Sequence, residues 1–141
     1  MSSTPPARAS IENTLAKWTW GMDQRDPDLL RAAYVPDAVI TMRFPGQDEV
    51  RVEGRDAIVS RMQELWERVP KRPLKQVVTN ILIEDLTDTS ATVRTYMNSI
   101  RVLDDVPLVT TSGYCIDRFV VHEGEWLIAE RLHEVDGRLA H

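Results

Sequence analysis

The chain has 141 residues, of which 43% are hydrophobic and 28% charged, and its formal net charge is −5. This length suits one domain with a proper core, and the negative charge argues against binding to a nucleic-acid backbone. No apolar run reaches the roughly 20 residues that cross a bilayer, and no apolar signal-peptide core follows Met1. The single cysteine, Cys115, excludes an internal disulfide and a cysteine-rich zinc site. Together these features predict a cytoplasmic protein with no membrane partner.

The N-terminal part of the sequence predicts a flexible tail followed by one amphipathic helix. Residues 1–9 are rich in Ser, Thr, Pro and Ala and offer little to bury. Ser10 is suited to cap a helix, and an apolar stripe follows it at helical spacing, formed by Ile11, Leu15, Trp18 and Met22. We therefore expect a tail over residues 1–9 and a single domain over residues 10–141.

Two more helices and a hairpin are expected before residue 74. Pro27 suits the first turn of a short helix whose apolar face includes Leu30 and Tyr34. Residues 38–44 and 49–53 resemble two strands around the Pro45-Gly46 turn. A third helix follows Gly54 and ends before Pro70, because proline cannot continue it.

From residue 74 onward the apolar period changes to two. Four long strands are predicted, over residues 74–84, 91–103, 108–121 and 126–135. Their connections are short and polar, which is typical of antiparallel hairpins. Helices followed by strands indicate an α+β fold, in which about three N-terminal helices cover one face of a curved antiparallel sheet. The resulting cone would admit a small molecule.

Six short strings in this order resemble the SnoaL-like branch of the nuclear transport factor 2-like superfamily. They are 22–26 (MDQRD), 34–38 (YVPDA), 53–58 (EGRDAI), 78–80 (VTN), 112–119 (SGYCIDRF) and 124–128 (GEWLI). That branch includes polyketide cyclases, scytalone-type and bile-acid dehydratases, and the β subunits of ring-hydroxylating dioxygenases. The resemblance spans Ser10 to Gly137 and implies the cone-shaped fold, while the activity depends on the site.

Asp23 is the first candidate for chemistry. In the dehydratases that this chain resembles, an Asp at this helix end takes part in acid–base chemistry with a Tyr and a His. Burial in an apolar cavity would raise the pKa of such a carboxyl toward neutrality. The alternative is that Asp23 only ends a helix. Trp18 stands where the bile-acid dehydratase pattern has Tyr; it could bind substrate by donating its indole N–H, or it could be a core residue.

Gln76 stands where the dehydratase pattern has His, and Asn80 matches the Asn that follows it. Being four apart on a strand, the two side chains are expected to share one face and to point into the cone near the end of the first helix. Glutamine can orient a substrate but cannot titrate. The resemblance to a dehydratase therefore lacks its acid–base histidine. Asn80 could instead be a structural residue.

His133 and Arg131 share a face of the last predicted strand with Ala129 and Leu127. If that face looks into the cone, His133 could act as a catalytic residue and Arg131 could bind an anion. The opposite face, with Trp126, Ile128 and Leu132, is more apolar, which favours an outward direction for His133.

Three further polar residues on long strands are substrate-binding candidates: Tyr96, Asn98 and Tyr114. If Tyr96 and Asn98 face the pocket, Val93 and Met97 lie on the convex face. Together with Trp126 and Ile128 they would form an apolar patch, and we expect a homodimer or homotrimer to cover it.

These observations lead to two functional hypotheses. The first is a cofactor-free enzyme of secondary metabolism, of cyclase, isomerase or dehydratase type, acting on an apolar small molecule with Asp23 as general acid or base. The second is a non-catalytic ligand-binding or scaffold protein of the same fold. The histidine spacing predicts no metal site, and the chain has no glycine-rich phosphate loop or nucleophile elbow.

Overall fold

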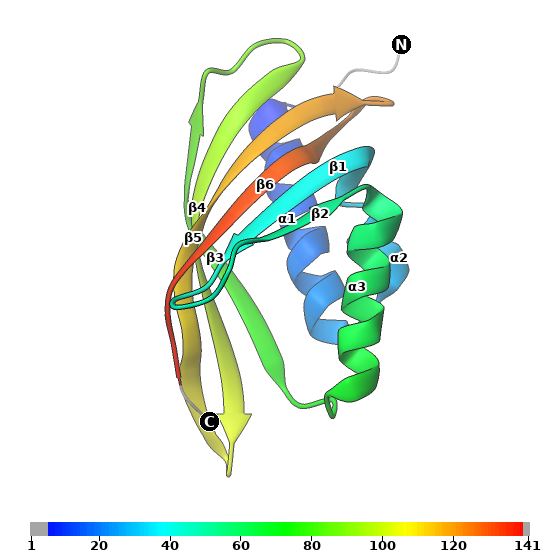
Figure 1. The fold of residues 1–141 in the computed structure, drawn as a ribbon. Helices are drawn as coiled ribbons and strands as arrows, with labels where there is room; N and C mark the ends of the chain where they lie inside the picture. Colours follow the sequence, from blue (N-terminus) through cyan, green and yellow to red (C-terminus); the bar gives the residue numbers. More distant parts are fainter. Residues whose placement is uncertain (1–5, 140–141) are drawn as a thin grey trace.

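The structure of the protein is a computed structural model that describes residues 6–139 (Figure 1). Three helices and six strands follow one another along the chain. Their bounds are α1 (Ala7–Gln24), α2 (Pro27–Arg31), β1 (Tyr34–Arg43), β2 (Val50–Glu53), α3 (Arg55–Arg68), β3 (Leu74–Glu84), β4 (Ser90–Leu103), β5 (Val106–His122) and β6 (Glu125–Arg138).

The strands form one curved sheet in the order β2-β1-β6-β5-β4-β3, and the helices cover its concave face (Figure 1). Neighbouring strands run antiparallel, with the exception of β1 and β6, which are parallel. The sheet is open, so β2 and β3 are its edges. This confirms the expected α+β fold and adds one parallel pairing to it.

Helix α1 begins four residues earlier than the sequence predicts. Its first residue is Ala7, so 7–9 of the expected tail are helical, while 1–5 lie outside the described residues. The predicted cap at Ser10 is wrong, because Pro6 occupies the N-cap and Ser10 lies within the helix, where its hydroxyl accepts a hydrogen bond from the backbone N–H of Trp126 at 3.2 Å. Here Ser10 joins α1 to β6 across the core.

Tyr34 opens strand β1, where the sequence predicted the apolar face of the second helix. Helix α2 begins with its Asp26 cap, whose carboxylate accepts from Leu29 N–H, and ends at Arg31. The chain then joins the sheet, because Ile128 N–H donates to the carbonyl of Ala33 at 2.9 Å and Tyr34 pairs with Ile128. Tyr34 is thereby fixed in the core, only 2% exposed.

The faces of strand β4 are the reverse of those expected. Its buried residues, Val93, Thr95 and Met97, face the helices, and the 0–2% exposure of these side chains leaves no room for a pocket beneath them. Tyr96 therefore points to the convex face, where it is 58% exposed. Asn98 shares this face by alternation, and so does Tyr114, which pairs with Tyr96 across β4 and β5.

A β-bulge in β6 explains why the face of His133 could not be read from alternation. Arg118 pairs with Glu130 and Phe119 pairs with Ile128, so Ala129 is an extra residue without a partner on β5. Such a residue shifts the alternation by one position. Ile128 and Arg131 consequently both face the helices, and both are buried.

The apolar patch proposed for the convex face is absent from it. Val93, Met97, Trp126 and Ile128 belong to the buried core, with exposures of 0–3%. This removes the argument on which the expected oligomer rested, and the oligomeric state remains a prediction. Within residues 6–139, no helix combines the length and apolar character needed to span a membrane.

Candidate functional site

A groove of about 740 Å³ runs between α1 and the edge strand β3. This volume is in the range of pockets that hold small ligands. The lining residues of α1 and its end are Glu12, Leu15, Ala16, Thr19, Trp20, Asp23 and Gln24. Those before and along β3 are Lys71, Arg72, Pro73, Leu74, Lys75, Gln76, Val77, Val78 and Ile81.

Asp23 lies in the wall of this groove, in the last turn of α1. Both of its carboxylate oxygens accept from the backbone N–H of Gln76, at 2.9 and 3.2 Å. Burial raises the pKa of Asp23, and the Gln76 hydrogen bond and the charge of Lys75 offset only part of this rise. The side chain therefore has the position and the electrostatic environment of a general acid or base.

Gln76 faces the groove beside Asp23, as the sequence predicted. Its side-chain Oε1 accepts a hydrogen bond from the Ser99 hydroxyl at 2.6 Å, across the β3–β4 pair. The side-chain amide has no protein acceptor among the described residues and can donate to a ligand. Gln76 thus supplies a hydrogen-bond donor at the position where the dehydratase pattern has a histidine.

Asn80 does not share this position with Gln76. A bulge in β3 between Thr79 and Leu82 breaks the alternation, and Asn80 occupies it with a left-handed φ of 57°. Asparagine tolerates this conformation better than most residues, which accounts for its presence there. Asn80 is exposed and does not line the groove, so its predicted inward direction is wrong. Tyr96, Asn98 and Tyr114 are on the far face of the sheet.

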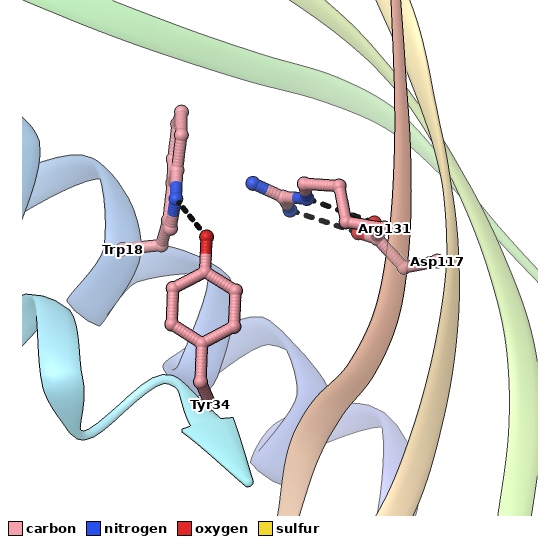
Figure 2. Close-up of polar contacts among 4 residues, drawn as sticks. All are labelled: Trp18, Tyr34, Asp117 and Arg131. Atoms are coloured by element: carbon pink, nitrogen blue, oxygen red, sulfur yellow. Dashed lines mark hydrogen bonds and ion pairs between the residues drawn. The ribbon is translucent and has the colours of Figure 1, made fainter. Parts of the chain in front are cut away.

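A second polar cluster lies deep between α1 and the sheet (Figure 2). Arg131 donates from Nε and Nη2 to the two carboxylate oxygens of Asp117, each at 2.8 Å, and the two side chains are 2% and 0% exposed. The guanidinium carbon lies 4.6 Å from the centre of the Trp18 ring, and Nη1 points toward this ring. Trp18 in turn donates from its indole N–H to the hydroxyl of Tyr34 at 2.9 Å.

This cluster is a packed connection between helix and sheet. The indole face accepts the positive edge of the guanidinium, which satisfies a group that otherwise has no hydrogen-bond acceptor within residues 6–139. Burial raises the pKa of Tyr34 to about 12, so its phenol stays protonated and cannot act as a base near neutrality. Neither Trp18 nor Arg131 lines the groove that holds Asp23.

His133 lies two residues beyond Arg131 on the inner side of β6, opposite Cys115 on β5. Burial, together with the positive charge of Arg131, lowers its pKa to about 4. The imidazole is therefore neutral at physiological pH. It is absent from the lining of the groove, so the structure gives Asp23 no histidine partner there.

Two features of the site were missed by the sequence reasoning. Tyr34 was assigned to a helix face, and nothing in its local sequence indicates that it accepts from Trp18. The second feature is the cationic rim of the groove, formed by Lys71, Arg72 and Lys75, which has a clear signal in the sequence. Residues 68–83 contain Arg68, Lys71, Arg72 and Lys75 and no acidic residue.

Across residues 6–139 no cluster of His, Cys, Asp and Glu is suited to bind a metal ion.

The fold and the groove are those of a small α+β domain with a ligand-sized site between α1 and β3. The SnoaL-like domain model matches residues 4–132, and the chain therefore belongs to the SnoaL-like family. Its nuclear transport factor 2-like, or cystatin-like, fold is shared by many solved structures. No curated protein matches the chain significantly.

Three solved structures illustrate this similarity. A Nostoc punctiforme protein of unknown function with a cystatin-like fold is 18% identical, over 99% of this chain and 98% of that chain, with a TM-score of 0.80. A candidate scytalone dehydratase from Novosphingobium aromaticivorans is 21% identical, over 95% and 87%, with a TM-score of 0.77. A Catenulispora acidiphila protein in complex with S-DNPA is 25% identical, over 92% of each chain, with a TM-score of 0.75.

Proposed function

We propose that the protein is a cofactor-free enzyme that transfers a proton on a small apolar molecule bound in the groove, with Asp23 as the general base. The observation that supports this most strongly is the placement of Asp23. Its carboxylate lies in the wall of a ligand-sized groove, is oriented by the Gln76 N–H and has a raised pKa.

The geometry leaves Asp23 able to accept a proton. A carboxylate has about four lone-pair positions, and the Gln76 N–H, shared between the two oxygens, occupies few of them. A single hydrogen bond fixes the direction of the group without satisfying it. Proton removal from a carbon acid would leave charge on a substrate oxygen, which the side-chain amide of Gln76 could stabilise.

Isomerisation or cyclisation fits this site better than dehydration. Dehydration needs one group to remove a proton and another to protonate the leaving hydroxyl. Asp23 and the exposed Glu12 are the carboxylates that line the groove, and no histidine among residues 6–139 lines it to serve as the partner of Asp23. Moving one proton within the substrate can use the same carboxyl first as base and then as acid. The similarity to a candidate scytalone dehydratase therefore supports the shared fold and not a dehydration reaction.

The test uses nitrobenzisoxazole, a probe that needs only a positioned base. Removal of its ring C–H proton breaks the N–O bond and releases a coloured cyanonitrophenolate. We expect Asp23→Asn to slow this reaction by roughly 10²-fold or more, the contribution of a general base, while Asn still accepts from Gln76 N–H. The wild-type rate should rise with pH through the pKa of Asp23, above 3.8.

The control for this test is Asp28→Asn, which changes an exposed carboxylate of α2 outside the groove. It should keep the wild-type rate. Equal rates for wild type and Asp23→Asn would rule out the acid–base role. An equal loss in Asp28→Asn would point to a general effect of charge.

A second candidate is a non-catalytic ligand carrier. It is favoured by the hydrogen bond that Ser99 donates to the side-chain oxygen of Gln76. This bond engages the residue that stands where the dehydratase pattern has a histidine. A carrier would bind ligand equally well with Asp23 or Asn at this position and would show no turnover with either. The same pair of variants therefore separates the two functions.

A further inference from the structure

The β3 side of the groove carries three cations at its rim, in a protein whose net charge is −5. Lys71, Arg72 and Lys75 are all exposed and all line the groove. Lys71 and Arg72 lie on the segment between α3 and β3, and Lys75 is the second residue of β3, next to the Gln76 N–H that donates to Asp23. No acidic residue lies between 68 and 83 in the sequence, and the two carboxylates of the lining, Glu12 and Asp23, come from α1 on the opposite side.

The segment that carries Lys71 and Arg72 is held in place by Arg25. This residue follows α1 in a left-handed conformation, with φ of 54°. Its guanidinium donates to the carbonyls of Trp66 and Val69 at 2.8 and 2.9 Å and to that of Pro70 at 3.1 Å. These carbonyls belong to the end of α3 and the start of the connecting segment. Arg25 therefore fixes the backbone immediately before Lys71.

Below the rim the larger part of the groove surface is apolar, with Asp23 and Gln76 as polar groups in its wall. Leu15 and Ala16 of α1 face Val78 and Ile81 of β3 across it, and Trp20 borders it with 61% of its surface exposed. A ligand that fills such a groove needs an apolar body, because apolar walls bind apolar surface. A ligand that also meets the rim gains from an anionic group at one end.

From this arrangement we infer that the groove binds amphipathic anions. The apolar body would lie between α1 and β3, and a carboxylate, sulfonate or phosphate would lie at Lys71, Arg72 and Lys75. The inference rests on the proposed function in taking the groove as the substrate site, and it adds the chemical class of the substrate. Binding of the anion would also neutralise Lys75, whose charge acts on Asp23.

Two fluorescent probes with the same aromatic body test this inference. Anilinonaphthalenesulfonate is anionic, and phenylnaphthylamine is the same molecule without the sulfonate. At low salt we expect the anionic probe to bind about tenfold more tightly, since three exposed cations each add a modest attraction. The preference should shrink as salt is added, because the charges are exposed to solvent.

Three variants locate the effect. Lys71→Gln, Arg72→Gln and Lys75→Gln in one protein should abolish the preference and leave the neutral probe unaffected. A control with Arg61→Gln, Arg94→Gln and Arg118→Gln makes the same change of charge at exposed positions outside the groove and should keep the preference. Ala16→Phe fills the groove from an exposed position and should weaken both probes. Thermal melts of each variant confirm that it is folded.

Each outcome decides one question. Equal binding of the two probes, with both weakened by Ala16→Phe, would overturn the anion preference and leave the groove as a binding site. Probe binding that Ala16→Phe does not change would overturn the inference altogether. The proposed catalytic role fails separately, if Asp23→Asn retains the rate with nitrobenzisoxazole.

Discussion

Arg131 and Asp117 place two opposite charges where an isolated charge would be very unfavourable. Both side chains are buried, and their bidentate contact is extended to α1 by the Trp18 ring, which in turn donates to the hydroxyl of Tyr34 on β1 (Figure 2). Desolvation of such a pair offsets much of its attraction, so its contribution to stability is small until one partner is removed. Substitution of one partner alone leaves the other charge buried without a counter-ion, which is strongly destabilising.

Removing one charge of the pair should therefore lower the free energy of unfolding more than removing both charges does. We expect Arg131→Met to lower the free energy of unfolding by about 3–5 kcal/mol, because it leaves the Asp117 carboxylate buried and unpaired. Arg131→Met combined with Asp117→Leu should be less destabilised than the single variant. Urea unfolding measures both. A control, Arg118→Met, removes an exposed pair with Glu130 and should change little. A double variant as unstable as the single one would contradict this account.

His133 should make the protein sensitive to acid. Its pKa is about 4 in the folded state against 6.5 in the unfolded chain. As the pH falls below 6.5 the unfolded chain takes up a proton that the folded protein does not, so stability falls until the pH reaches about 4. Between pH 7 and 4.5 this amounts to roughly 2–3 kcal/mol.

The matched variant for this prediction is His133→Gln, which does not titrate. Urea unfolding at pH 7 and 4.5 should show a smaller loss in the variant than in the wild type. Asp23 acts in the opposite direction, because its raised pKa lets the folded state take up a proton first. That contribution is common to both proteins and cancels. An equal loss in both would show that His133 is not held neutral by burial.

At the level of elements, α1 and α2 come into close backbone contact at Gly21. A Cβ built on Gly21 would lie 2.7 Å from the backbone nitrogen of Leu30 and 2.9 Å from its Cα. We expect Gly21→Ala to lower stability by about 1–2 kcal/mol, since overpacking outweighs the better helix propensity of alanine. Gly137→Ala, where a Cβ meets no atom within 4 Å, is the control and should be nearly neutral. Thermal melts that rank the two variants in the reverse order would contradict this.

The elements were easier to predict than the directions of their side chains. Helical and strand periods persist over ten or more residues, so β3 and α3 begin and end within a residue or two of the predicted positions. A bulge depends on one extra residue, and it reverses every side chain beyond it. Ala129 in β6 and Asn80 in β3 have this effect. The predicted inward direction of Asn80 is wrong for this reason, and the direction of His133 could not be decided from alternation.

Asp23 and Gln76 were predicted more successfully than the rest of the site. Each lies close to the end of an element. The family resemblance therefore predicts its position directly, and the prediction does not depend on counting alternating residues along a strand. Tyr96, Asn98 and Tyr114 depended on a choice between two faces of β4 and β5, and polar character favoured the wrong one. The apolar alternation of Ala91, Val93 and Met97 was the better guide to the buried face.

At the scale of the whole molecule, the groove lies at an edge of the sheet, where one strand has a neighbour on one side only. Strands β5 and β6 have neighbours on both sides, while β3 is an edge, and α1 covers it from the concave side (Figure 1). An edge strand presents unpaired backbone N–H groups. Asp23 accepts from one of these, so the residue proposed for catalysis also joins α1 to β3.

Hydrogen exchange should reveal this joint role. The amides of β5 should exchange most slowly and those on the open side of β3 quickly, because edge hydrogen bonds are missing there. The Gln76 amide should be an exception, protected by the Asp23 carboxylate, whereas the Val78 amide, which points the same way two residues on, should exchange fast. Asp23→Ala should expose the Gln76 amide and lower stability by about 1 kcal/mol, while Asp23→Asn should preserve its protection. Fast exchange at Gln76 in the wild type would show that Asp23 is not held in the groove wall, and the proposed orientation of the base would then be wrong.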